Sequence, residues 1–366
     1  FGSYTELLNT MNDKLPKVII STIQSSGSFI KKTSKGYEII KQLGMNNFTM
    51  YYIFTDEKTK TTKNKSIKLE KLIDNYTKFE AVDCDLSNKC KSSIFNLWNG
   101  FQSDLGGNPN SDSATMMKEY IKTIWASNHD EYYNYIISWI ANLVQLGNDI
   151  NKTALVMVSE QGCGKDTLID FLGYILGIKC ILRESGINNI VQKHNDHLVN
   201  KRLVIINEMS SVREEFKSNF DRIKPYITEN RIDIEPKGLA KYDVRNISNY
   251  MIFTNHRDSV IVEGSDRRYA IFELSNIHRC DVDYFTTIRN NCFNQQCAND
   301  FYAYLMEYKT QCVFNIPMTE FKLEMKELNK PSWRKFMDEF TETRKDEGMK
   351  GGELYKEYTE WCRLNG

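Results

Sequence analysis

Short apolar runs alternate with longer amphipathic stretches in the middle of the chain. Four runs are almost continuously apolar, at residues 154–158, 203–206, 250–253 and 269–272. Runs of this length without polar alternation are typical of parallel strands that are covered by helices on both faces. After the first run, residues 168–176 place their apolar side chains at helical spacing. The pattern predicts an α/β fold with a parallel sheet flanked by helices.

The parts before this region have a different pattern. Strand-like runs such as residues 49–54 stand beside a lysine-rich stretch at 58–71, which we interpret either as a solvated loop or as a positive collar for a nucleic-acid backbone. A turn-rich segment at 106–113 marks a candidate boundary. An aromatic stripe at helical spacing follows at residues 132–143, and we expect it to pack in a core.

The amino-acid composition restricts the class of protein but does not identify a binding partner. Lys and Arg number 48 and Asp and Glu also number 48, so any nucleic-acid contact must come from local cations. The nine cysteines include no CxxC pair, which suits a reducing, intracellular compartment. No apolar run approaches the roughly 20 residues of a membrane-spanning helix, so we do not expect an integral membrane protein. Because the chain begins at Phe1, we interpret it as a fragment of a longer protein.

A phosphate-binding loop lies between the first apolar run and the helix that follows it. Backbone N–H groups at a helix start point outward unpaired, so they can bind triphosphate oxygens, and Lys165 can reach the β and γ phosphates. Ser159 replaces the usual first glycine, and Asp166 stands where Ser or Thr normally binds Mg²⁺. Asp166 or Thr167 can hold the metal, and the sequence does not choose between them. The predicted ATP-binding residues are Glu160, Gln161, Gly162, Cys163, Gly164, Lys165, Asp166 and Thr167.

Polar residues follow the later apolar runs. Glu208 comes shortly after the second run and is our candidate for the base that orients the attacking water and for a further Mg²⁺ ligand. Asn255 follows the third run, where its amide can sense the γ phosphate, although an Asn after a strand is also a common turn residue. Arg267 and Arg268 precede the fourth run, and one of them can serve as an arginine finger for the nucleotide of an adjacent subunit. The alternative for this pair is a surface salt bridge with Asp266.

The segment between the second and third runs predicts a β-hairpin. Residues 231–235 alternate polar and apolar, and a Pro-Lys-Gly turn follows with Lys237 at its tip. An exposed lysine at such a tip is a strong phosphate contact if the hairpin projects into the channel of a ring, with Lys241 in support. Without a ring it is a solvated turn.

The order of these features within about 110 residues resembles superfamily 3 helicases. The Gly-Lys-Asp loop and the segment at 94–101 resemble most closely the primase-helicases of phages and large DNA viruses. The resemblance implies an AAA+-type core that forms a hexameric ring, with ATP and Mg²⁺ between subunits and single-stranded or forked DNA in the channel. Lys165 and Glu208 would occupy the two Walker positions, Asn255 the sensor, Lys237 the channel hairpin, and Arg268, rather than Arg267, the finger.

This resemblance completes the predicted organisation. We expect an N-terminal α+β or helical region of unknown role at 1–110, a helical collar at 111–149, the ATPase core at 150–278, and a helical region at 279–366 that ends in the start of a winged-helix-like tail. The implied function is ATP-dependent DNA unwinding at an intracellular site of viral or phage replication, with a primase domain in the same full-length chain. The alternatives are a ring ATPase that remodels protein or packages DNA, and a nucleotide-binding module without catalysis.

Overall fold

A five-stranded parallel sheet forms the centre of the molecule. The computed structural model describes residues 19–23, 28–33, 36–41, 49–55, 62–68, 77–207, 213–238, 240–257, 267–328, 330–343 and 349–365. The sheet has the order β10-β11-β14-β9-β15, with every neighbouring pair parallel. Its strands are β9 (Ala154–Val158), β10 (Ile181–Glu184), β11 (Leu203–Ile206), β14 (Asn249–Thr254) and β15 (Tyr269–Glu273). The four predicted runs are therefore strands of one sheet, and β10 is a fifth at its edge.

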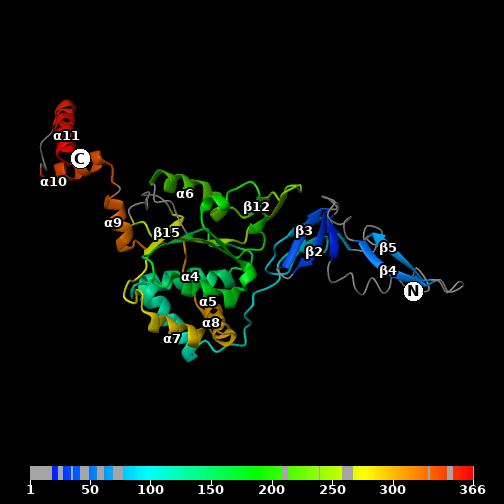
Figure 1. Ribbon diagram of the computed structural model, residues 1–366. Coiled ribbons are helices and arrows are strands. Elements are labelled where there is room, and N and C mark those ends of the chain that lie inside the picture. The colour runs from blue at the N-terminus through cyan, green and yellow to red at the C-terminus, as the bar shows by residue number, and fades with distance from the viewer. Residues whose placement is uncertain are drawn as a thin grey trace.

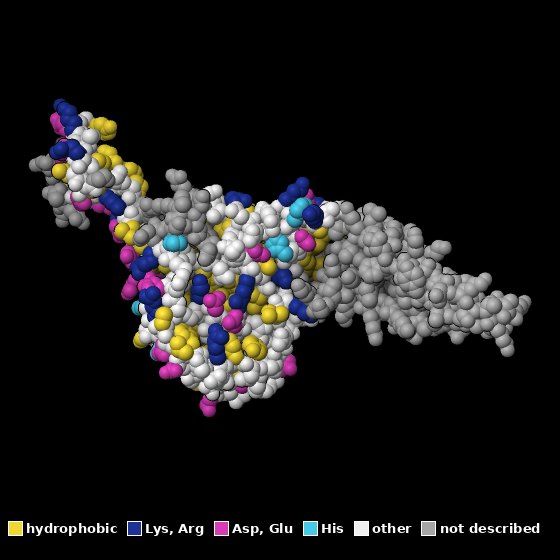
Figure 2. Space-filling model, viewed as in Figure 1, with side chains coloured by type: hydrophobic (Ala, Val, Ile, Leu, Met, Phe, Trp, Pro, Cys, Tyr) yellow, Lys and Arg dark blue, Asp and Glu magenta, His cyan; other side chains and the backbone are white. Residues whose placement is uncertain are grey.

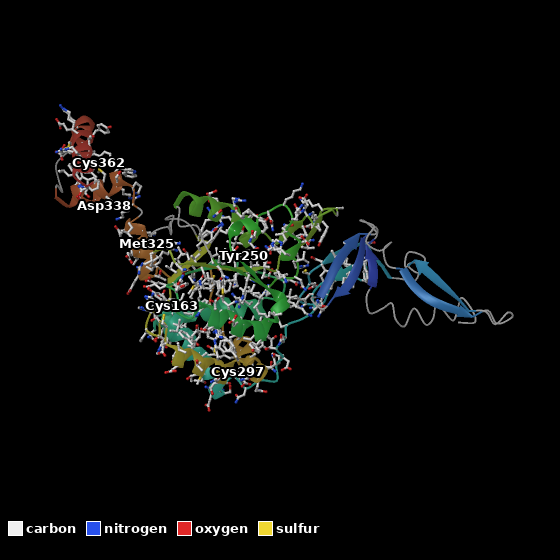
Figure 3. The ribbon with its side chains drawn as sticks, viewed as in Figure 1. Cys163, Tyr250, Cys297, Met325, Asp338 and Cys362 are labelled. Carbon is white, nitrogen blue, oxygen red and sulfur yellow. The ribbon has the colours of Figure 1, made fainter. Side chains whose placement is uncertain are left out.

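Helices cover both faces of this sheet (Figure 1). On one face, α6 (Arg213–Thr228) packs on β15, where the Tyr269 hydroxyl donates to the Phe220 carbonyl at 2.8 Å. On the other lie α4 (Asp130–Gln145), α5 (Lys165–Leu176) and α8 (Gln295–Glu307). Tyr135 and Trp139 of α4 are completely buried, so the aromatic stripe is core, as predicted. Side chains fill the space on both sides of the sheet (Figure 3).

Further elements precede and follow this α/β core (Figure 1). The N-terminal strands are β1 (Ile19–Ile23), β2 (Ser28–Thr33), β3 (Gly36–Lys41) and β6 (Thr77–Phe79) in one sheet, the pair β4 (Thr49–Thr55) and β5 (Thr62–Lys68), and the parallel pair β7 (Ala81–Asp83) and β8 (Ile94–Asn96). Part of the lysine-rich stretch, expected to be a loop or collar, is strand β5. The remaining helices are α3 (Asp112–Tyr120), α7 (Val282–Cys292), α9 (Glu320–Leu328), α10 (Ser332–Thr343) and α11 (Gly351–Asn365). Among the described residues, no helix is both long and apolar enough to cross a membrane.

A buried arginine ties the sheet to α4. The Arg202 side chain is fully buried just before β11, and its guanidinium donates to the backbone carbonyls of Leu143, Asn142, Asp149 and Ile247 at 2.6 to 3.0 Å. Burial lowers the pKa of Arg202 to about 9. Four carbonyls at the ends of α4 and of the following loops are thereby satisfied without water, which holds the starts of β9, β11 and β14 in register.

Candidate functional site

The predicted phosphate loop connects β9 to α5, and its two glycines adopt conformations that favour glycine. Gly162 has φ +84° and Gly164 has φ +88°, and Gly164 is the N-cap of α5. A Cβ atom on Gly164 would lie 2.4 Å from the Phe285 ring, and one on Gly162 would lie 2.7 Å from the Cys280 sulfur. Both positions therefore need glycine for backbone conformation and for space. The Thr167 N–H donates to the Gly164 carbonyl at 3.1 Å. The N–H groups before it precede the helical hydrogen bonds of α5, and N–H groups in this position can bind an anion.

The segment after β15 clamps the loop from one side. Arg279 forms an ion pair with Glu160 and donates to the Gln161 carbonyl at 3.2 Å. The Cys163 thiol donates to the Asn276 amide oxygen at 2.9 Å, and burial raises its pKa. Thus Glu160 and Cys163, which the sequence assigned to ATP binding, direct their side chains to loop support. Backbone groups of these residues remain the candidates for ligand contact.

Lys165, Asp166 and Thr167 line a pocket of about 460 Å³ at the start of α5. Lys165 is half-buried and makes no ion pair with the part of the chain that the structure describes. Asp166 is half-exposed, with its carboxylate 4.0 Å from the Arg183 guanidinium, whereas Thr167 is buried. The opposite wall comes from α7 and from Cys280, two residues before it; the α7 residues are Val282, Phe285, Thr286 and Arg289.

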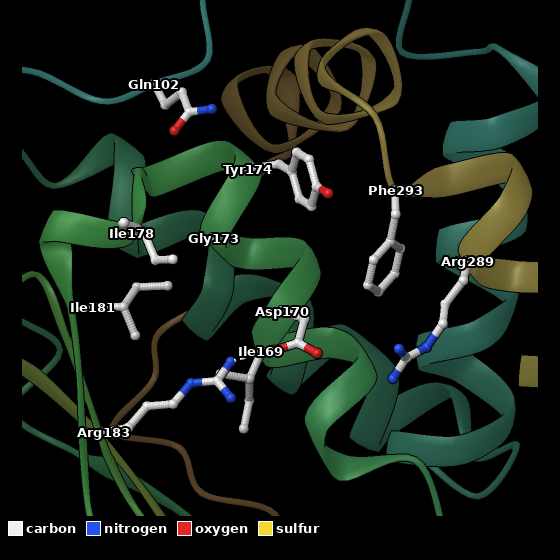
Figure 4. Close-up of a pocket in the computed structure, with 10 residues that line it drawn as sticks. All are labelled: Gln102, Ile169, Asp170, Gly173, Tyr174, Ile178, Ile181, Arg183, Arg289 and Phe293. Carbon is white, nitrogen blue, oxygen red and sulfur yellow. Dashed lines mark hydrogen bonds and ion pairs between the residues drawn. The ribbon is translucent and has the colours of Figure 1, made fainter.

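A second hollow, of about 840 Å³, follows α5 away from the loop (Figure 4). Its lining is mostly apolar and aromatic, with Tyr174 from α5 and Phe293 from just after α7. Arg183 of β10 bridges to Asp170 of α5 at 2.5 Å across the floor. Arg289 lines this hollow as well as the loop pocket, so the two are neighbours. Sequence reasoning missed Arg289, since nothing in its local pattern separates it from a surface residue of an amphipathic helix.

Polar residues end the strands beside the loop. Because β14 lies between β9 and β11, the residue after it, Asn255, stands between the loop and the end of β11. The Ser159 hydroxyl and the Asn207 amide oxygen are buried and have no hydrogen-bond partner among the described residues. Such orphaned oxygens are rare in proteins, and bound water or ions satisfy them in many cases. Glu208, the candidate base, lies outside the described residues.

Arg267 and Arg268 lie at the opposite end of the strands from the phosphate loop. They precede β15, which runs parallel to β9, and the Arg268 carbonyl accepts a hydrogen bond from the Ala154 N–H at 2.7 Å. Since each strand rises roughly 3.3 Å per residue, a five-residue strand separates them from the loop edge by about 16 Å. A cavity of about 510 Å³ brings both arginines together with Lys152, Thr228 and Phe314. Sequence reasoning missed Lys152, a lone lysine before a strand, which carries no signal by itself.

The predicted hairpin is present and presents Lys237 on its exposed turn. Strands β12 (Arg231–Ile234) and β13 (Tyr242–Arg245) pair in antiparallel register, with Ile234 opposite Tyr242. The Asn195 side chain fixes the start of the turn through the Asp233 carbonyl and the Glu235 N–H, both at 2.9 Å. Lys241 forms an ion pair with Asp233 at 2.7 Å, so its ammonium group has a partner within the hairpin. In the region of β12, dark-blue Lys or Arg side chains lie beside cyan His side chains on the surface (Figure 2).

A protein-family model and a curated relative each match part of this chain. Residues 157–268 match a family that is described only as a family of unknown function, DUF5906. Over 157 residues, or 41% of this chain, the sequence is 29% identical to the DNA primase-polymerase of Nitratiruptor phage NrS-1. The chain spans about a fifth (21%) of the length of that relative.

Solved structures extend the likeness to nearly the whole chain. The A-form apo structure of the NrS-1 C-terminal region has a TM-score of 0.68 and 19% identity, covering 96% of this chain and 85% of that one. Another apo structure of that region has a TM-score of 0.67 and 18% identity, covering 94% and 83%. Identities this low establish the fold alone. The chain is therefore related in sequence to the NrS-1 primase-polymerase and shares the fold of its C-terminal region.

Proposed function

We propose that the chain is an ATP-hydrolysing module that forms rings, moves along single-stranded DNA and unwinds it during viral or phage replication. The observation that carries the proposal is the phosphate loop: two glycines with positive φ turn the chain into α5, and Lys165 stands at the edge of a pocket of about 460 Å³. Positive φ, outward N–H groups and a lysine at a helix start together favour a polyphosphate.

The residues present fit ATP with Mg²⁺. The N–H groups at the start of α5 and the Lys165 ammonium would hold the β and γ phosphates. Asp166, Thr167 and Glu208 remain the candidates for holding Mg²⁺, and the orphaned oxygens of Ser159 and Asn207 supply polar groups for water nearby. When bound, Mg²⁺ neutralises developing charge on the phosphates. Glu208 would accept the proton of the attacking water, and Asn255 would hydrogen-bond the γ phosphate from the neighbouring strand end.

The position of the arginines favours catalysis between subunits. Arg268 immediately precedes β15, at the opposite end of the strands from the loop of its own subunit. A guanidinium about 16 Å from its own loop can act on a phosphate only if another subunit presents that phosphate. Lys152 and Arg267 beside it add positive charge to the same cavity. This requirement is met by a ring in which the loop of each subunit faces the arginines of the next subunit. We prefer an AAA+-type ring.

The name of the curated relative points to DNA as the polymer that this chain would bind. The curated relative is named a DNA primase-polymerase, and we propose that this chain likewise comes from a protein of viral DNA replication. Lys237, exposed at the tip of a braced hairpin, would contact the phosphate backbone, while Lys241 would keep the turn in shape through Asp233. Hydrolysis would shift the hairpin and with it the strand that it holds.

ATP binding by the loop is the first requirement of this proposal. We expect Lys165→Ala to weaken ATP binding at least tenfold and to abolish turnover, because the ammonium contacts the β and γ phosphates. Lys179→Ala is the matched control, since Lys179 is exposed just after the far end of α5. Isothermal titration with ATP and Mg²⁺, together with phosphate release, measures both effects. Equal binding by both variants would remove the loop from the nucleotide site.

A further inference from the structure

A tyrosine from outside the predicted core makes the shortest contact with the carbonyl that ends the phosphate loop. Tyr120 is the last residue of α3, and its hydroxyl donates to the Gly164 carbonyl at 2.5 Å. The side chain is completely buried. Immediately after it the chain forms a π-helix, η3 (Ile121–Trp125), a rare conformation that is frequent at functional sites. No sequence pattern connects this residue with the loop, because Gly164 lies 44 positions later.

The hydrogen bond fixes the plane of the peptide between Gly164 and Lys165. A trans peptide is planar, so its C=O and its N–H point in opposite directions. With the Gly164 carbonyl held toward Tyr120, the Lys165 N–H is directed away from α3. The same carbonyl also accepts the first bond of α5, from the Thr167 N–H at 3.1 Å. The orientation of the Lys165 N–H therefore depends on both partners of one carbonyl.

The surroundings leave Gly164 little freedom to turn any other way. A Cβ on Gly164 would lie 3.0 Å from the Tyr120 hydroxyl and 2.4 Å from the Phe285 ring. The Tyr120 ring stacks with Tyr284 of α7, with centroids 6.5 Å apart, and Tyr284 stacks on His278 at 3.7 Å. Helices α3 and α7 thus hold the last turn of the loop between them.

Burial raises the pKa of Tyr120 well above its usual range. The hydroxyl therefore stays protonated at neutral pH and remains a hydrogen-bond donor.

We propose that Tyr120 is a positioning residue for nucleotide binding, which directs the Lys165 N–H toward the phosphates and makes the helical segment at 111–149 part of the nucleotide site. The inference rests on the proposed function, because it assumes that the loop binds a nucleoside triphosphate. It adds a physical link between the α3–η3 segment and the loop: any movement of α3 would turn the Gly164–Lys165 peptide.

The experiment compares Tyr120→Phe with Tyr135→Phe. Tyr135 is also fully buried and donates to a backbone carbonyl, that of Val313, at 2.8 Å, but it lies on α4, away from the loop. Both variants lose one hydroxyl and one hydrogen bond to a carbonyl. Titration with ATP and with inorganic tripolyphosphate gives the affinities, and thermal melts without ligand give the stabilities.

We expect Tyr120→Phe to bind ATP and tripolyphosphate more weakly by a similar factor, on the order of fivefold, which is the size of one hydrogen bond. Tyr135→Phe should melt at a reduced temperature yet keep wild-type affinity for both ligands. Wild-type affinity of Tyr120→Phe, or a loss for ATP but not for tripolyphosphate, would overturn the positioning role while leaving the proposed function intact. If the wild-type protein binds neither ligand, the proposed function itself fails, and this inference with it.

Discussion

Asp85 shows how a single buried carboxylate stabilises the segment that leads into the core. It is 3% exposed and accepts hydrogen bonds from the Asn148 amide at 2.8 Å and the Ser87 hydroxyl at 2.6 Å, besides the N–H groups of Ser87 and Lys89. Burial by itself would raise the pKa of Asp85, but these hydrogen bonds outweigh it and lower the pKa from 3.8 to about 2. The ionised form is therefore the one that the folded state prefers.

The sign of this shift sets a pH window for stability. Because the pKa is depressed in the folded state, the contribution of Asp85 is fully present above about pH 4 and is lost as the pH falls toward about 2. We expect the loss to be about 2 kcal/mol of the free energy of unfolding. Urea unfolding at pH 5, 4 and 3 should show this dependence in the wild type and a flatter one in Asp85→Asn. Asp196→Asn, which changes an exposed carboxylate, is the control, and an unchanged slope in Asp85→Asn would contradict the account.

Residues whose role depends on local backbone chemistry could be predicted from the sequence, and residues defined by distant partners could not. Gly162 and Gly164 were recognisable because a strand-to-helix turn requires them. Arg202 gave no such signal: an arginine before a strand is usually exposed, and only the fold brings four carbonyls around it. Tyr120 and Lys152 were missed for the same reason. Lys241 was expected to contact DNA, and its pairing with Asp233 depends on the register of the hairpin.

At the scale of elements, hydrophobic periodicity predicted four of the five strands and the hairpin. The missing strand, β10, has the sequence Ile-Leu-Arg-Glu, two apolar residues followed by two charged ones, so it lacks a continuous apolar run. The order of strands was also beyond the sequence. Hydrogen-bonded pairing places β14 between β9 and β11, and this position puts Asn255 next to the loop.

Because the strands are parallel, the candidate catalytic residues fall into two groups at opposite ends of the strands. At the carboxyl ends of the strands lie the loop, Asn207 and Asn255. At the amino ends lie Lys152 and Arg268. Because such a division cannot complete a site within one subunit, it is the element-scale reason for expecting an oligomer.

For the whole molecule, mixing subunits of two variants tests whether the arginine of one subunit acts at the loop of another. We expect Arg268→Ala to reduce turnover by about 10³-fold or more, as loss of an arginine finger does in other enzymes. Mixed with Lys165→Ala subunits, it should recover part of the activity, since some interfaces then combine an intact loop with an intact arginine. Light scattering on the same samples records whether rings persist. Intact rings without recovery would count against action between subunits.

The proposed movement on DNA, driven by ATP hydrolysis, is tested by measuring ATP turnover with and without single-stranded DNA. The proteins are the wild type, Lys237→Ala, and Lys179→Ala as an exposed-lysine control. We predict that DNA stimulates turnover in the wild type and in Lys179→Ala, whereas Lys237→Ala keeps its basal turnover and loses the stimulation. Turnover that is indifferent to DNA in the wild type would contradict the account and favour a ring ATPase that acts on protein.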